Sequence, residues 1–143
     1  MTSLWGMTPR QSIEAECARR GRAEVVGGCV ELLRGRQSDE QLLLALGGPP
    51  ARHYLTGATP PDYWLRVWAT RGLLWAWSDE ASPALRTALA DEHWRVREMA
   101  LKVVARHLVG DVLPAVQELR SDPGKRVRAA AERAVVRMIA SRA

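Results

Sequence analysis

The chain places apolar residues three or four positions apart over long stretches, which is the spacing of one face of an α-helix. Segments that alternate apolar and polar residues, as half-buried strands do, are scarce. The helical stripe has two clear copies, which are Val96, Ala100, Val103 and Val104 and, further along, Val127, Ala131, Val135 and Ile139. The pattern therefore predicts an all-α protein in which these apolar stripes are buried.

Proline, glycine and capping residues divide the chain into predicted helices. Thr8 and Pro9 indicate the start of a first helix and Gly21 its end. Further helices are predicted over about residues 22–34, 39–47, 62–77, 83–90, 93–109, 111–120 and 125–140, with a brief turn at 51–55. The connections between them are short, so we expect successive helices to pack antiparallel.

One phrase occurs three times at an interval of 31 residues, first as Leu65-Arg66-x-x-Ala69 and then with valine at 96 and 127. A fixed period of this length is typical of repeat proteins, whose units bury their apolar faces only by stacking on neighbours. An aspartate precedes the arginine by six residues in the last two copies, whereas Pro60 takes its place in the first. We predict a structural turn ladder in which aspartates cap the long helices and face arginines of adjacent repeats, formed by Asp91, Arg97, Asp122 and Arg128.

This pattern, Asp-x-x-x-x-Val-Arg-x-x-Ala, resembles the HEAT-repeat family in its short bacterial form. The resemblance is strong over residues 81–140 and fair over 62–77. It implies a HEAT-like α-solenoid, a right-handed superhelix of antiparallel helix pairs whose long second helices line the concave face. We expect one domain over residues 8–143, with regular repeats at 61–143, degenerate helices at 8–60 acting as an N-terminal cap, and a loose extension at 1–7.

A second set of positions in the 31-residue register is basic and aromatic. We call this set the basic stripe, and it consists of Trp64, Trp68, Arg71 and Trp75, then Arg95, Met99, Lys102 and Arg106, then Arg126, Ala130, Arg133 and Arg137. None of these twelve residues is acidic. Arg95, Lys102, Arg126 and Arg133 are expected to be exposed on one face, where guanidinium groups and tryptophans suit an anionic ligand. The alternative is a solvated helix face beside core tryptophans.

Charge and composition narrow the function without naming a partner. The net charge is +5, and residues 93–143 hold eleven basic residues against five acidic ones. The sequence lacks an apolar run of membrane-spanning length and a recognisable signal peptide, so we expect a cytoplasmic protein without a membrane partner. No metal site, cofactor or catalytic residue is predicted, because two cysteines and three scattered histidines form no known pattern. The candidate acid–base groups, Glu98, Glu132, His93 and His107, are interpreted as surface or packing residues.

Three functions follow from these features. The first is a non-enzymatic scaffold or adaptor that binds a protein partner through the basic concave face. The alternative is nucleic-acid binding, which the resemblance to HEAT-like alkylpurine DNA glycosylases implies for a basic groove with tryptophans. A third is an accessory role like that of the HEAT-like subunits of bilin lyases. The last helix, which leaves Ala134, Met138 and Ile139 without a following repeat, also predicts homodimerisation through this end.

Overall fold

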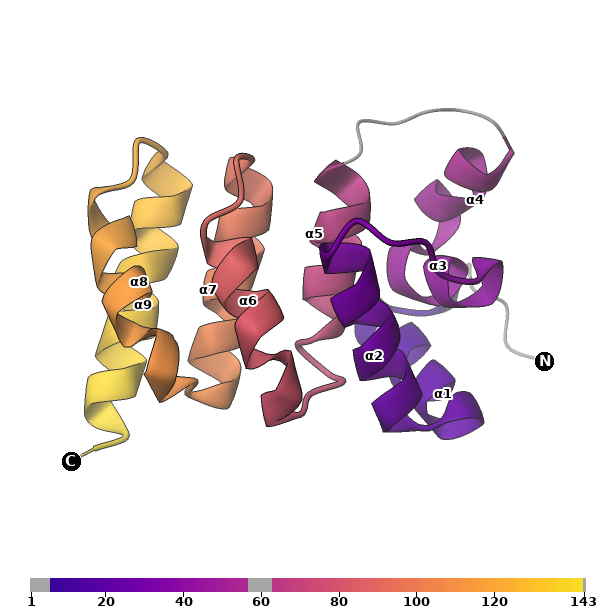
Figure 1. The fold of residues 1–143 in the computed structure, drawn as a ribbon, viewed down its shortest axis with the longest axis horizontal. Helices are drawn as coiled ribbons and strands as arrows, with labels where there is room; N and C mark the ends of the chain where they lie inside the picture. Colours follow the sequence, from indigo (N-terminus) through magenta and orange to yellow (C-terminus); the bar gives the residue numbers. More distant parts are fainter. Residues whose placement is uncertain (1–5, 57–62, 143) are drawn as a thin grey trace.

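The computed structural model describes residues 6–56 and 63–142, and over these residues it is all-α, as predicted (Figure 1). Residues 1–5, most of the expected extension, and Pro60 lie outside the described residues. The helices are α1 (Pro9–Arg20), α2 (Arg22–Leu33), α3 (Glu40–Gly47), α4 (Pro49–Leu55), α5 (Tyr63–Gly72), α6 (Ser82–Leu89), α7 (Trp94–His107), α8 (Leu113–Glu118) and α9 (Lys125–Ala140). Short 3-10 turns precede α6 and flank α8, namely η2 (Asp79–Ala81), η3 (Gly110–Val112) and η4 (Leu119–Ser121).

The helices form a solenoid-like stack with two rows. In one row α5, α7 and α9 pack side by side, and in the other α6 and α8 pack against α7 and α9 (Figure 1). The N-terminal helices extend both rows, because α3 packs beside α5 while α2 packs against α5 and also touches α6. The helix pairs therefore continue into the part of the chain where the repeat pattern is lost.

The apolar stripes form the core of the stack. The prediction that Val96, Ala100 and Val104 are buried is confirmed, since none has measurable exposure. Val127, Ala131 and Val135 on α9 are buried in the same way. Alanine at the middle position leaves little side chain between neighbouring helices, and among the described helices α7 and α9 share the most extensive contact.

The N-terminal helix begins and ends where the sequence indicates. The Thr8 hydroxyl accepts the Gln11 N–H at 3.1 Å, and the Gln11 side chain accepts the Thr8 N–H at 3.0 Å. This reciprocal pair is a capping box, with Pro9 at the first helical position. Gly21 has a φ of 96°, which a residue with a Cβ rarely adopts, and its N–H donates to the Cys17 carbonyl.

The predicted helix over 62–77 is too long, because α5 ends at Gly72. A Cβ at Gly72 would lie 2.6 Å from Leu46 Cδ2 and 2.8 Å from Cys29 Sγ, so glycine permits the close approach of α3 and α2. Beyond it the chain tightens, and the Leu73 N–H donates to the Thr70 carbonyl three residues earlier at 3.0 Å. Trp75 therefore lies outside the helical face on which the sequence placed it.

Residues 51–55, predicted as a turn, belong to helix α4. Gly48 has a φ of 66° and precedes the helix, and Pro49 and Pro50 occupy its first positions. Proline at the start of a helix loses no hydrogen bond and has a suitable φ. The Gly-Pro-Pro sequence thus starts a helix rather than only breaking one.

Of the three residues predicted to be uncovered at the end of the stack, two are buried. Ala134 and Met138 are buried rather than uncovered, because α9 packs against α7 on one side and against α8 and η4 on another. Ile139 is 61% exposed, and Val136, one helical turn away, is 57% exposed. The outward apolar surface of the last helix is therefore small.

His107 at the end of α7 links two units of the stack. Its ring stacks on Trp77 with 4.8 Å between ring centroids, and its Nε2 donates to the Leu73 carbonyl at 2.8 Å. Burial lowers the pKa of His107 because it disfavours the charged imidazolium, although the hydrogen bond to Leu73 opposes the shift. The folded protein thus holds this histidine neutral at a pH where the unfolded chain is already protonated.

We expect the protein to become less stable as the pH falls through about 6.5, the usual pKa of histidine in an unfolded chain. The sign follows because the unfolded state takes up this proton first, so stability is fully present above that pH and is lost below it. Urea unfolding between pH 5 and 8 measures the slope, and His107→Gln is expected to flatten it. An unchanged slope in the variant would assign the pH dependence to other groups.

Candidate functional site

The middle part of the basic stripe lies on the exposed face of α7. The helix has α5 on one side, α9 on the other and α6 behind it, so only one stripe of its surface remains open. Lys102 and Arg106 are exposed on this stripe, and Arg95 and Met99 are half-buried. The sequence register thus identifies the face of α7 that the neighbouring helices leave open.

The stripe continues across α9. Arg126, Arg133 and Arg137 are exposed, while Ala130 between them is buried. The Arg137 Nε donates to the Ala105 carbonyl at 2.9 Å, which ties the end of α9 to α7. Among the residues that the structure describes, the side chains of Arg106 and Arg133 make no hydrogen bond or ion pair.

One buried acid moderates the charge of this surface. Glu98 on α7 is 7% exposed and receives Nε and Nη2 of Arg126 at 2.8 and 3.1 Å. Lys102 Nζ lies 3.7 Å from the same carboxylate. Glu98 is four residues before Lys102 on the same helix, and this spacing was the signal in the sequence for the pairing. The surface is therefore less positive than the residues of the basic stripe alone indicate.

Tryptophan and arginine side chains alternate across the starts of α5, α7 and α9. The Arg95 guanidinium carbon lies 5.1 Å from the Trp64 ring centroid and 4.6 Å from that of Trp94. Arg126 lies 5.2 Å from the Trp94 ring. Arg95, predicted to be exposed, is half-buried because it lies against both rings. Trp94 was not predicted from the sequence because it lies one residue before Arg95, the first position of the basic stripe in this repeat.

In the first repeat the stripe is largely covered. Trp68 is 5% exposed, so its assignment to a binding surface is wrong. Its ring lies over Gly47, where a Cβ would approach it to 2.7 Å, because α3 and α4 pack on this side of α5. Arg71 is half-buried and donates Nη2 to the Leu46 carbonyl at 2.6 Å, while Trp64 and Trp75 are half-buried against the core.

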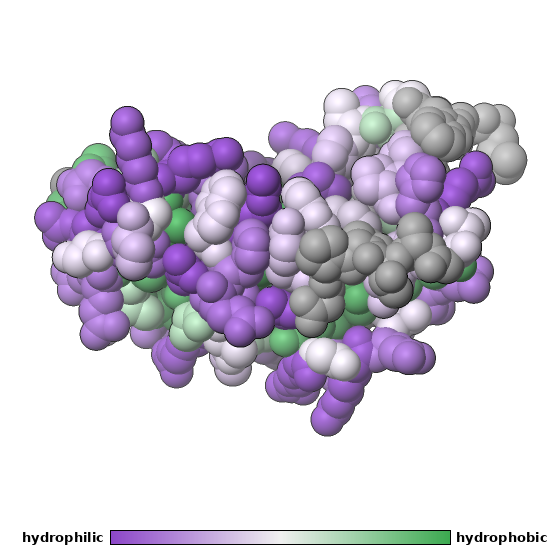
Figure 2. Space-filling model, turned by 90° about the horizontal axis from the view of Figure 1, so that it is seen from above, coloured by the Kyte–Doolittle hydropathy of each residue, from purple (hydrophilic) through white to green (hydrophobic). Residues whose placement is uncertain are grey.

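The aspartates of the turn ladder join adjacent repeats. Arg66 Nε and Nη2 donate to Asp91 at 2.6 and 3.2 Å, and Arg97 contacts Asp122 in the same way at 2.9 and 3.2 Å. The arginine six residues after each aspartate donates a hydrogen bond back to the turn, as Arg128 does to the Asp122 carbonyl at 2.9 Å. Figure 2 views the end of the stack that carries these turns, and hydrophilic side chains cover most of it.

The capping role of these aspartates differs from the prediction. Asp91 accepts the His93 N–H at 2.8 Å, and Asp122 accepts the Gly124 N–H at 2.8 Å, so both shape the turn before the helix. His93 is the N-cap of α7, where its Nδ1 accepts the Arg95 N–H at 3.2 Å. Its ring also stacks on Tyr63 with 3.6 Å between centroids.

The remaining candidate groups have structural partners. Glu132 pairs with Arg120 at 3.0 Å on the exposed side of α9, away from the basic stripe. Among the described residues, no three His, Cys, Asp or Glu side chains are grouped as metal ligands. None of the helices described is long and apolar enough to cross a membrane.

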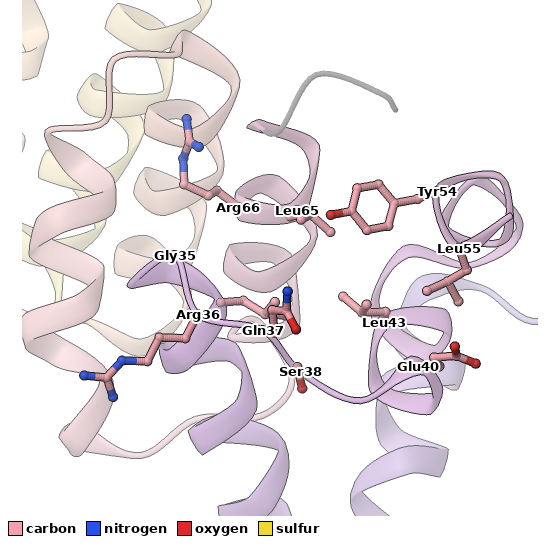
Figure 3. A pocket seen from close by; sticks show the side chains of 11 residues that line it. Gly35, Arg36, Gln37, Ser38, Glu40, Leu43, Tyr54, Leu55, Leu65 and Arg66 are labelled. Atoms are coloured by element: carbon pink, nitrogen blue, oxygen red, sulfur yellow. The ribbon is translucent and has the colours of Figure 1, made fainter. Parts of the chain in front are cut away.

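A pocket of about 420 Å³ lies on another part of the molecule, between α2, α3, α4 and the start of α5 (Figure 3). Leu43, Leu55 and Leu65 provide its apolar wall, and Gln37 and Ser38 lie at its side (Figure 3). None of the residues of the basic stripe lines it. Sequence reasoning did not identify this pocket, because it depends on how α3 and α4 fold back beside α5.

A family model described as HEAT repeats matches residues 52–136, which is more than half of the chain and runs from within α4 to within α9. No curated protein and no solved structure matches the chain.

Proposed function

The chain belongs to the HEAT-repeat family, and from this premise we propose that it is a non-enzymatic adaptor that binds an acidic segment of a protein partner through the basic stripe. HEAT repeats generally mediate protein–protein interaction or scaffolding, because a stack of helix pairs presents a broad continuous surface. In this protein the surface would be the basic stripe, and the partner would present acidic side chains.

The observation that supports this surface is the side-chain content of the open face of α7 and its continuation on α9. Lys102, Arg106 and Arg133 are exposed there, and the same columns hold no acidic residue. Guanidinium groups without an internal partner bind carboxylates through paired N–H groups. Acidic side chains of a partner would therefore find donors on Arg106 and Arg133 that the protein itself does not use.

The features of the stripe favour a protein over a nucleic acid. Stacking of bases needs open aromatic faces. Trp68 is buried, and guanidinium groups already lie over the rings of Trp64 and Trp94. Arg126, the cation beside this cluster, is also neutralised by Glu98.

The test reverses two charges on the stripe, in the variant Lys102→Glu with Arg133→Glu. We expect partner affinity to fall by about tenfold or more, because like charges then face the acidic segment. The matched control is Arg10→Glu with Arg22→Glu, which changes the net charge equally at exposed positions on α1 and α2. Pull-downs from host lysate with the wild type and both variants identify the partner, and a binding titration with the purified partner then measures the loss.

A partner that both variants retain equally would contradict the proposed surface. The nucleic-acid alternative is checked by fluorescence anisotropy with duplex and single-stranded DNA at two salt concentrations. Tight binding that weakens steeply with salt and disappears in the stripe variant would replace the adaptor function with nucleic-acid binding. Circular dichroism of each variant ensures that a loss of binding does not reflect unfolding.

A further inference from the structure

A small cavity lies at the N-terminal end of the basic stripe. It has a volume of about 240 Å³ and is formed where α1 begins and where α3 passes into α4. Its lining is mostly apolar, with one charged side chain, and includes Met7, Pro9, Leu46, Pro49, Pro50 and Arg71. The size fits a single functional group with a short hydrocarbon part rather than a whole cofactor.

Among the described residues that line this cavity, Arg71 is the only one with an ionisable side chain. It holds the same register position as Lys102 and Arg133, so it faces the same side of the stack. Its Nη2 donates to the Leu46 carbonyl at 2.6 Å, but its Nε is buried and has no hydrogen-bond partner. Within the described residues, this Nε is the one buried side-chain nitrogen or oxygen without a partner.

The other polar side chains of the cavity make no hydrogen bond to this Nε. The Ser12 hydroxyl donates to the Ala45 carbonyl at 2.8 Å, and the Thr8 hydroxyl accepts the Gln11 N–H. None of the described lining residues carries a carboxylate, so these residues provide no counter-ion for the Arg71 guanidinium. A buried N–H of a charged group that is left unbonded is costly, and an anion in the cavity would remove this cost.

We propose that this cavity binds a carboxylate group, presented by the acidic segment of the partner. A carboxylate can accept N–H groups of a guanidinium, and Arg71, which lines the cavity, has an Nε without a partner and an Nη2 that uses one N–H for the Leu46 carbonyl. The proline and methionine side chains enclose the hydrocarbon part of such a group. A phosphate carries more charge and would require further donors, which the wall does not provide. The source of the carboxylate rests on the proposed function, but the cavity itself does not.

The first experiment uses propionate as a probe of the cavity, with propionamide as its neutral control. NMR follows the Arg71 Nε–H resonance and the Met7 methyl resonance of the intact protein. We expect propionate to shift both resonances in a saturable way at millimolar concentration, and propionamide and inorganic phosphate to have much weaker effects. Equal shifts with propionate and propionamide, or no saturable shift with propionate, would overturn the proposal.

Two variants test the guanidinium itself through the Met7 methyl signal. Arg71→Gln removes the charge, and Arg71→Lys keeps a cation without the paired N–H groups. We expect propionate affinity to fall by about tenfold or more in Arg71→Gln and by less in Arg71→Lys. Affinity unchanged in both folded variants would refute the site. Propionate binding together with failure of the stripe variants would leave the carboxylate pocket standing and reject only the proposed adaptor surface.

Discussion

Replacing Trp68 by alanine is expected to lower the free energy of unfolding by about 3–5 kcal/mol, the usual loss for a buried large aromatic side chain. The ring is 5% exposed and lies against Gly47 and thus between α5 and α3. Its removal would leave a cavity at the junction between the regular repeats and the N-terminal helices. Urea unfolding followed by circular dichroism measures the change.

Trp64 provides the matched control, since it lies four residues earlier on the same helix. Its ring is half-buried and contacts Arg95 from outside the core. Trp64→Ala should therefore cost only about 1 kcal/mol. Equal losses in the two variants would show that Trp68 does not have the core position described here.

Asp122→Ala is the second substitution with a large expected effect, about 3–5 kcal/mol. The carboxylate is 8% exposed, holds Arg97 of the preceding repeat through two hydrogen bonds and accepts the Gly124 N–H. Alanine would leave the partly buried Arg97 without its counter-ion and the turn without its internal acceptor. The free energy of unfolding, measured in urea, is the quantity to compare.

The control for this prediction is Glu132→Ala. Glu132 also pairs with an arginine of an adjacent element, Arg120, but their side chains are 57% and 47% exposed. Exposed ion pairs contribute about 0–1 kcal/mol, since water screens them. If Asp122→Ala proved as mild as Glu132→Ala, the turn ladder would have no important part in holding the repeats together.

The fold of residues 63–142 was largely predictable because each unit repeats the same sequence pattern. The apolar stripe sets the buried face of α7 and α9, and the 31-residue period requires the units to stack. The end of α5 was not predictable from this period. It depends on the close approach of Leu46 and Cys29 to Gly72, which are contacts between residues far apart in the sequence.

The exposure of the basic stripe was predictable to the extent that it follows the helical register. Lys102, Arg106 and Arg133 are exposed where the columns placed them. Trp68 and Arg71 occupy equivalent positions on α5, but α3 and α4 cover that side, and no pattern in residues 8–60 indicated it. The pairing of Glu98 with Arg126 and the contact of Trp94 with the same arginine were not predictable, because both join side chains on neighbouring helices.

The turn ladder has a consequence for how such a chain can change in length. Each bridge joins an arginine of one unit to the aspartate that opens the next, as Arg66 does with Asp91 and Arg97 with Asp122. A tandem duplication of any 31 residues in this region would supply one new arginine and one new aspartate in matching places. The gene could therefore gain or lose whole units in one step. Every new junction between units would contain its own arginine–aspartate bridge from the start.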